Sequence, residues 1–247
     1  MLEDSIKAAA RALSGAGQVM AFTGAGVSAE SGVATFRGAG GLWEGQPVEQ
    51  VATPEAFRRD PLRVWRFYEA RRVQASTVRP NPAHETLARW QRRFPAFCLA
   101  TQNVDGLHQA AGSREVLELH GGLWRVRCTA CDRQREDRTV PLHELPPRCS
   151  ACGAIERPDI VWFGEVLPTD ILSAAAQAAA KAEVFVVVGT SAVVYPAAGL
   201  VEIAASAGAT IIEVNPAASA LAHLADIVLR GPAGELLPRI DATLEVS

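Results

Sequence analysis

Two cysteine pairs are the strongest chemical signal in this sequence. They are Cys128/Cys131 and Cys149/Cys152, with seventeen residues between the pairs. Each Cys-x-x-Cys unit offers two thiolates to one tetrahedral ion, so the two units predict a structural zinc site with no open position for catalysis. Free thiols or two disulfides are the alternatives. The remaining cysteine, Cys98, lies in an apolar run and is predicted to be a small buried core residue.

A glycine-rich segment is the second signal. The residues Gly24-x-Gly26-x-x-Ala29 follow a short apolar run at 18–23. Glycines at this spacing let the backbone turn tightly and approach a pyrophosphate, which the start of the next helix favours. An ordinary tight turn is the alternative. Because the run before it predicts a buried strand, we favour nucleotide binding.

The elements that must position these residues alternate between strands and helices. Valine- and isoleucine-rich runs without polar alternation predict strands buried on both faces at 18–23, 96–101, 184–188, 210–214 and 226–229. Helical spacing of apolar residues predicts helices at 2–14, 83–93, 171–182 and 196–207. This alternation predicts an α/β protein with a Rossmann-like, doubly wound parallel sheet.

Two segments interrupt the alternation. Residues 38–80 are arginine-rich with helical patterning, and residues 121–157 carry the cysteine pairs and several prolines. We expect these insertions to form a smaller domain, one part helical and the other a zinc ribbon. The Rossmann-like domain would then comprise residues 1–37, 81–120 and 158–247.

Composition limits the partners and the compartment. The 247 residues have a net charge of −3, which gives no general attraction to nucleic acid or to an anionic membrane. No apolar run reaches the ~20 residues that span a bilayer, and no signal peptide is visible. We therefore expect a cytoplasmic protein in a reducing compartment that binds neither nucleic acid nor a membrane.

Seven short motifs follow one another along the chain. They are GAGVSAESG at 24–32, TFR at 35–37, TQNVDGLH at 101–108, LHG at 119–121, VWFGE at 161–165, GTS at 189–191 and NP at 215–216. In this order they resemble one family, the sirtuins, which are NAD-dependent protein-lysine deacylases. The resemblance covers nearly the whole chain from about residue 15. Ala34 and Ala192 depart from the residues common in the family without removing a functional group.

The resemblance implies that NAD and an acyl-lysine peptide bind between the two domains. The acyl oxygen would attack the nicotinamide ribose, and nicotinamide, O-acyl-ADP-ribose and free lysine would be the products. His120 matches the family's general base and Asn103 a second catalytic residue, and Glu213 would be a further nucleotide contact. The implied cofactor-binding residues are Gly24, Ala25, Gly26, Glu30, Thr35, Phe36, Arg37, Gln102, Asn103, Asp105, Gly189, Thr190, Ser191, Asn215 and Ala233.

The same resemblance implies how substrate is bound. The peptide would add as a strand between the segments 161–164 and 193–195, with contacts from Val161, Phe163 and Gly164. Trp162 is either part of this cleft or a core aromatic residue. Tyr68 and Arg71 match the Tyr-x-x-Arg pair of class III sirtuins, which remove malonyl and succinyl groups. Arginine can bind a carboxylate with two parallel hydrogen bonds, and Ala52 matches the small residue that leaves the acyl pocket wide.

Three other functions remain open at this stage. An NAD-dependent dehydrogenase needs an acid at the end of its second strand, and none is evident. A mono-ADP-ribosyltransferase would modify protein and not release O-acyl-ADP-ribose. A non-enzymatic NAD-sensing zinc module would not need His120, Asn103 and Asp105 together.

Overall fold

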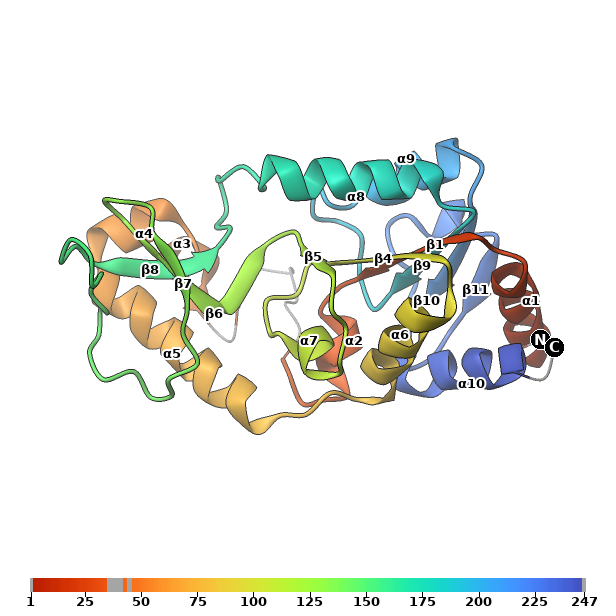
Figure 1. The fold of residues 1–247 in the computed structure, drawn as a ribbon, viewed down its shortest axis with the longest axis horizontal. Coiled ribbons are helices and arrows are strands. Elements are labelled where there is room, and N and C mark those ends of the chain that lie inside the picture. The colour runs from red at the N-terminus through yellow and green to blue at the C-terminus, as the bar shows by residue number, and fades with distance from the viewer. Residues whose placement is uncertain (1, 35–41, 44–45, 246–247) are drawn as a thin grey trace.

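The computed structural model describes residues 2–34, 42–43 and 46–245. Within these residues, six parallel strands form a sheet in the order β11-β10-β9-β1-β4-β5 (Figure 1). The predicted doubly wound sheet is therefore confirmed. The strands are β1 (Gln18–Thr23), β4 (Ala96–Thr101), β5 (Val116–Glu118), β9 (Val184–Val188), β10 (Thr210–Val214) and β11 (Ile227–Leu229).

Alternate residues of the central strands enter two separate cores. In β1, Val19 and Ala21 face one core, whereas Met20 and Phe22 face the other. Burial on both faces explains why these strands read as continuous apolar runs. The first core is covered by α1 (Leu2–Ser14), α6 (Pro82–Arg93) and α10 (Ala233–Glu245), and the second by α8 (Thr169–Lys181) and α9 (Gly199–Ser206).

The two insertions pack against each other at the far end of the elongated molecule (Figure 1). The strands β6 (Gly121–Cys128), β7 (Gln134–Glu136) and β8 (Glu156–Ile160) form an antiparallel sheet in the order β7-β6-β8. Trp65 of the first insertion and Val126 of the second share one hydrophobic cluster. The first insertion contributes β2 (Leu42–Trp43), β3 (Gln46–Pro47), α3 (Val48–Val51), α4 (Pro54–Arg59) and α5 (Pro61–Thr77).

Two details differ from what the sequence predicts. Strand β8 runs through residue 158, so the expected boundary between 157 and 158 falls inside a strand. Cys98 was expected to be buried, but the structure leaves it half-buried at the start of the sheet. Partial burial still raises the pKa of Cys98 to about 11, which keeps it a neutral thiol at pH 7. Among the described residues, no helix combines the length and apolar character that crossing a bilayer requires.

The turn from the large sheet into the zinc-bearing strands depends on one glycine. Gly121 has φ of +75°, and a Cβ atom there would lie 2.1 Å from the carbonyl oxygen of Asp159. Strand β6 therefore approaches β8 so closely at this point that no side chain fits. The residue before this turn is His120.

We expect Gly121→Ala to lower the free energy of unfolding by at least about 3 kcal/mol, because a positive φ and a backbone clash act together. Gly112→Ala is the matched control, since Gly112 also has a positive φ of +99° but nothing lies within 4 Å of the added methyl group. The control should lose only about 1–2 kcal/mol. Urea denaturation of both variants measures the difference, and equal losses would contradict the close approach at Gly121.

Candidate active site

Two loops at the carboxyl edge of the sheet pack backbone against backbone. Gly24 follows β1 and donates its N–H to the carbonyl of Val188 at 3.1 Å, and Gly26 donates to Gly189 at 2.7 Å. A Cβ atom on Gly26 would lie 2.6 Å from the Gly189 carbonyl oxygen. The glycines of the predicted nucleotide loop are thus required where the loop after β1 packs on the loop after β9. Helix α2 (Gly26–Ala29) begins at this contact.

Thr190 holds two other predicted cofactor residues, Gln102 and Asn215, in one place. Its hydroxyl accepts a hydrogen bond from Gln102 Nε2 at 2.9 Å and one from the backbone N–H of Ala192 at 3.1 Å. Asn215 Nδ2 donates to the Thr190 carbonyl at 2.9 Å. Loops that follow β4, β9 and β10 therefore meet at one polar point. Ala192 takes a positive φ of 51° to make this turn.

A buried polar cluster lies beneath the glycine loop. Asn103 Nδ2 donates to Ser28 Oγ at 3.1 Å, and Ser28 Oγ donates to Asp105 Oδ2 at 2.8 Å. The Leu107 N–H donates to the other carboxylate oxygen, Oδ1, at 2.9 Å. Burial raises the pKa of Asp105, although these two hydrogen bonds oppose the rise. Asn103 and Asp105 are thus fixed side by side, which the sequence predicted only as a common motif.

His120 has the protonation state that a general base needs. Its Nδ1 lies 3.0 Å from the carbonyl oxygen of Gln102. Because a carbonyl can only accept, Nδ1 carries the hydrogen and Nε2 keeps its lone pair. Burial lowers the pKa of His120, although the hydrogen bond to Gln102 opposes this, so the ring is neutral at pH 7.

A pair of buried histidines supports this cluster from below. The rings of His84 and His108 lie 4.8 Å apart, and both side chains are buried. His84 Nε2 is 3.3 Å from Ser28 Oγ, and His108 Nε2 is 2.9 Å from Thr23 Oγ1. Burial lowers the pKa of His84 to about 4 and that of His108 to about 3, with repulsion between the two rings adding to the second shift.

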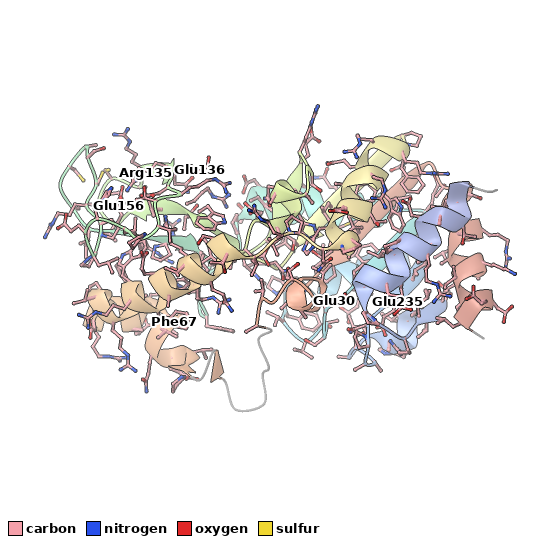
Figure 2. All side chains as sticks on the ribbon, turned by 90° about the horizontal axis from the view of Figure 1, so that it is seen from below. Glu30, Phe67, Arg135, Glu136, Glu156 and Glu235 are labelled. Carbon is pink, nitrogen blue, oxygen red and sulfur yellow. The ribbon has the colours of Figure 1, made fainter. Side chains whose placement is uncertain are left out.

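Several predicted nucleotide contacts lie elsewhere or outside the described residues. The carboxylate of Glu30 accepts a hydrogen bond from the Gly234 N–H at 2.7 Å, so it contacts the first turn of α10 next to Ala233 (Figure 2). Glu213 is buried and contacts Ser219 and Arg230. Ser191 follows Thr190 in the chain, and its side chain is exposed. The predicted residues Thr35, Phe36 and Arg37 lie outside the described residues.

The predicted substrate residues converge around Trp162. Its indole Nε1 donates to the Tyr68 hydroxyl oxygen at 3.0 Å, and the next N–H, of Phe163, donates to the Ala52 carbonyl at 3.0 Å. Trp162 is 3% exposed, and the centre of its ring lies 5.2 Å from that of Phe57. It is therefore a core residue. The sequence left both roles open for it. Val161 is partly buried, and its N–H donates to the His120 carbonyl at 3.0 Å.

Tyr68 and Arg71 lie on the same side of α5 in buried positions. They are 0% and 6% exposed, and the guanidinium of Arg71 lies 6.0 Å from the ring of Phe67. Burial raises the pKa of Tyr68, while the Trp162 hydrogen bond and the positive charge of Arg71 oppose this rise. Since the Tyr68 oxygen accepts from Trp162, its own hydrogen is directed to another acceptor. The pair therefore presents donors and one positive charge.

The cysteine pairs form a site that fits zinc. The sulfur atoms of all four residues lie within 4.8 Å of one another, and the Cys131–Cys149 and Cys131–Cys152 separations are 3.7 Å. Zinc–sulfur bonds of about 2.3 Å at tetrahedral angles require about 3.8 Å between sulfurs. Backbone N–H groups of Ala130 and Ala151 point at Cys128 and Cys149 Sγ at 3.4 Å, which stabilises thiolates.

Several residues that hold the site together were not singled out from the sequence. Ser28 and His84 carry buried hydrogen bonds beside Asp105, and His108 contacts Thr23 at the end of β1. Trp124 Nε1 donates to the Asp105 carbonyl at 2.8 Å. Ser28 belongs to the glycine motif, and Asn81 and His84 form a capping box at the start of α6. A capping signal was therefore present at Asn81, but it does not indicate which side chain the histidine meets across the sheet.

Acid should destabilise the fold through the two buried histidines. The unfolded chain binds protons near pH 6.5, whereas folded His108 does not until about pH 3, so stability falls as the pH drops below 6.5. Between pH 6.5 and 5, each histidine should remove about 2 kcal/mol from the free energy of unfolding. His108→Gln should reduce this loss by about 2 kcal/mol in urea denaturation, and the exposed control His143→Gln should not. An unchanged pH dependence in His108→Gln would show that this ring does not titrate on unfolding.

Comparison with known proteins agrees with this geometry. The sequence model of the Sir2 family matches residues 24–196. A protein of Aquifex aeolicus named NAD-dependent protein deacylase is 49% identical over 222 residues, which cover 90% of this chain and 93% of the relative. A protein of Pyrobaculum aerophilum named NAD-dependent protein deacylase 2 is 52% identical over 219 residues, 89% of this chain and 88% of the relative.

Solved structures with the same fold contain nucleotides and peptides. A Sir2 homolog–NAD complex has a TM-score of 0.90 and 44% identity, with 100% of this chain and 95% of the other covered. A Sir2–p53 peptide–NAD+ complex has a TM-score of 0.84 and 31% identity, with coverage of 96% and 97%. Sir2Af2 bound to a myristoylated histone peptide has a TM-score of 0.79 and 36% identity, with coverage of 99% and 98%. The chain belongs to the Sir2 family.

Proposed function

We propose that this protein is an NAD-dependent protein-lysine deacylase that yields nicotinamide, O-acyl-ADP-ribose and free lysine. One observation carries the proposal. The neutral His120 ring donates its Nδ1–H to the carbonyl oxygen of Gln102, the residue before Asn103, and this leaves the Nε2 lone pair available. Relatives that share about half of their residues with this chain are named NAD-dependent protein deacylases.

The residues at the sheet edge suit a dinucleotide. Asn103 and Asp105 are buried polar side chains held by Ser28, and a sugar or a carboxamide can use the donors and acceptors they direct. Gln102 and Asn215, which are both hydrogen-bonded to Thr190, supply further polar groups for the other end of the dinucleotide. NAD, when bound, supplies the ribose carbon from which nicotinamide leaves and to which the acyl oxygen becomes attached.

His120 is the residue that moves a proton in this reaction. With Nδ1 held on Gln102, Nε2 accepts the proton of a ribose hydroxyl, and the ring then becomes a cation. The lowered pKa keeps the base neutral before this step at physiological pH. Asn103 and Asp105 hold the sugar in place through the polar groups that Ser28 orients. A mono-ADP-ribosyltransferase would use the same nucleotide site, and the mass of the product separates the two activities.

The peptide substrate binds as an added strand beside Phe163 and Tyr195. Three large apolar side chains at this place are exposed, with 46% for Phe163, 60% for Val193 and 57% for Tyr195. Exposed apolar residues on these two segments suit a partner whose main chain pairs between them. One structure of the same fold holds a myristoylated histone peptide, and another holds a p53 peptide. Main-chain pairing would let the enzyme accept many sequences around one acyl-lysine.

The acyl groups that this site accepts include malonyl and succinyl as well as acetyl. Arg71 is buried, and the Tyr68 hydroxyl oxygen accepts from Trp162. The guanidinium of Arg71 can donate two parallel hydrogen bonds to the carboxylate of a malonyl or succinyl group, which an acetyl group does not offer. Ala52 adds no bulk beyond its methyl group beside this pair.

Zinc thiolates persist in a reducing compartment, so a cytoplasmic location remains our prediction.

We expect His120→Ala to lower kcat at least about 100-fold, because the ribose hydroxyl loses its base. Zinc content and unfolding free energy should stay unchanged. The wild-type kcat/KM should fall on the acidic side with a midpoint below pH 6.5, since burial lowers the pKa of His120. His223→Ala, at an exposed histidine, is the control. Near-normal turnover by His120→Ala would remove the histidine from the mechanism.

Arg71→Met should lower kcat/KM for a succinyl-lysine peptide about 100-fold and change that for the acetyl-lysine peptide by less than about threefold. The same peptide carries each acyl group in turn, and mass spectrometry identifies the O-acyl-ADP-ribose. Arg66→Met, on the exposed side of the same helix, should change neither value. Equal losses on both peptides would rule out carboxylate recognition by Arg71.

A further inference from the structure

Helix α5 carries two neighbouring sets of side chains. Tyr68 and Arg71 form the acyl pair described above. Trp65, Glu69 and Arg72 are spaced four and three residues apart, so they form a stripe along one side of the helix, and Tyr68 borders this stripe because it is three residues after Trp65 and four before Arg72. All three of these side chains contact the zinc-bearing insertion. Any movement of that stripe must therefore move the acyl pair as well.

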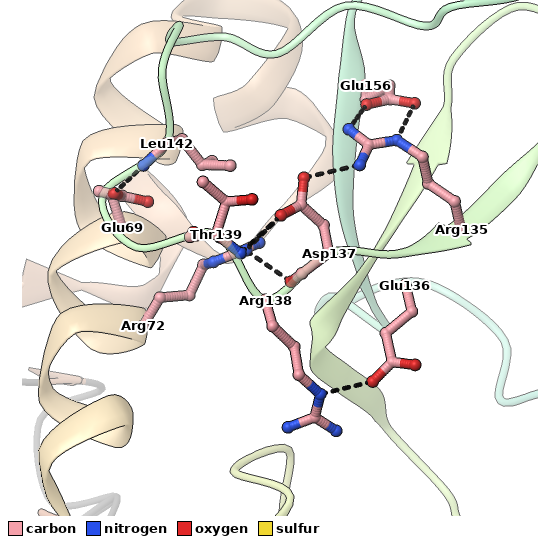
Figure 3. Close-up of polar contacts among 9 residues, drawn as sticks. All are labelled: Glu69, Arg72, Arg135, Glu136, Asp137, Arg138, Thr139, Leu142 and Glu156. Atoms are coloured by element: carbon pink, nitrogen blue, oxygen red, sulfur yellow. Dashed lines mark hydrogen bonds and ion pairs between the residues drawn. The ribbon is translucent and has the colours of Figure 1, made fainter.

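The first two residues of the stripe contact two different parts of the insertion. Trp65 Nε1 donates to the carbonyl of Glu156 in β8 at 2.7 Å. Glu69 Oε1 accepts a hydrogen bond from the Leu142 N–H at 2.7 Å (Figure 3). These contacts place the middle of α5 across strand β8 and the segment that follows β7.

Arg72 makes the strongest of these contacts. The residue is 1% exposed, and one terminal nitrogen donates to the Asp137 carbonyl at 2.6 Å, to Asp137 Oδ1 at 3.2 Å and to the Thr139 carbonyl at 3.1 Å (Figure 3). The guanidinium also lies 5.5 Å from the centre of the Trp124 ring. A buried cation that loses its carboxylate is strongly destabilised, so this contact fixes the helix firmly.

Asp137 is in turn fixed to the strands that carry the zinc ligands. Its Oδ2 accepts from Arg135 at 2.6 Å, and Arg135 binds both carboxylate oxygens of Glu156, at 3.1 and 2.6 Å. Glu156 is the register partner of Cys128 across β6 and β8. One unbroken series of polar contacts and strand pairs therefore runs from Cys128 to Arg72. Figure 3 shows the part of it from Glu156 to Arg72.

We propose that Arg72 is a positioning residue that locks α5 onto the zinc-binding strands and thereby sets the selectivity for acyl groups. The proposal rests on the carboxylate-binding role proposed for Arg71. Two parallel hydrogen bonds to a carboxylate tolerate shifts of only about 0.5 Å or 10–20°. A bound acetyl group makes no such charged contact, so a small displacement of α5 lowers succinyl turnover selectively.

The test compares Asp137→Asn with Glu136→Gln in the full-length, zinc-loaded protein. Asp137→Asn keeps the shape of the side chain but removes the charge that Arg72 faces. Glu136 is next to it in β7, is 62% exposed and pairs only with Arg138 among the described residues, so it is the matched control. We expect Asp137→Asn to raise KM for succinyl-lysine about tenfold, with kcat nearly unchanged and with kcat/KM for acetyl-lysine within about twofold.

A second measurement does not depend on activity. Hydrogen–deuterium exchange of residues 64–76 should become at least about fivefold faster in Asp137→Asn and stay unchanged in Glu136→Gln. Arg72→Lys should give the same two results, because lysine cannot span the Asp137 and Thr139 oxygens with one planar group.

The possible failures are distinguishable. If wild-type protein does not act on succinyl-lysine, the proposed acyl preference is wrong, and the exchange rates alone decide whether Arg72 holds α5. If Asp137→Asn lowers succinyl and acetyl turnover equally, Arg72 stabilises the fold without setting selectivity, and the proposal is overturned. Unchanged exchange in α5 overturns it as well.

Discussion

The common register of the parallel strands is the constraint on which the active site depends. Thr23 of β1 is the register partner of Thr101 in β4 and of Val188 in β9, and Val188 is the partner of Val214 in β10. Four loops therefore leave the sheet at one level. A shift of one residue in any pair would turn a buried strand face over and also separate the loops. Hydrogen bonding within the sheet thus controls the distances between side chains on different loops.

Polar groups are buried at two places, and the two places differ in kind. The Asp105 carboxylate accepts from the Ser28 hydroxyl and the Leu107 N–H, and Asn103 and His84 contact that hydroxyl in turn. Around Asp137 and Glu156 the partners are Arg72 and Arg135, so two negative charges face two positive ones. The first arrangement suits the binding of a sugar and the second suits the joining of two segments. Burial alone would not distinguish them.

The sequence was sufficient for the main sheet and for the groups with distinctive spacing. Apolar runs predicted β1, β4, β9 and β10 to the residue, and the cysteine pairs predicted a metal cluster. It did not predict β5, which has three residues, or β6, whose alternating and charged residues lie between the sheet and the cysteines. Helix α10 was also missed, and it contains a proline. Short or mixed patterns carry too little periodicity to be read.

Contacts between distant residues were beyond the sequence for a different reason. Arg72 and Asp137 are 65 positions apart, and nothing in either segment indicates the other. The same holds for His84 and His108, which meet only because α6 crosses below the loop after β4. Tyr68 and Arg71 could be singled out through a family resemblance, whereas their burial and their neighbour Trp162 required coordinates.

The zinc-bearing insertion leaves the large domain after His120 and re-enters it at Val161. The Val161 N–H donates to the His120 carbonyl at 3.0 Å. This hydrogen bond closes the base of the insertion, so the spacing between His120 and Val161 does not depend on the length of chain between them. Residues can be added or removed at exposed positions of the insertion away from the four cysteines while His120 keeps its place. Evolution, or a protein engineer, can thus alter this insertion without moving His120.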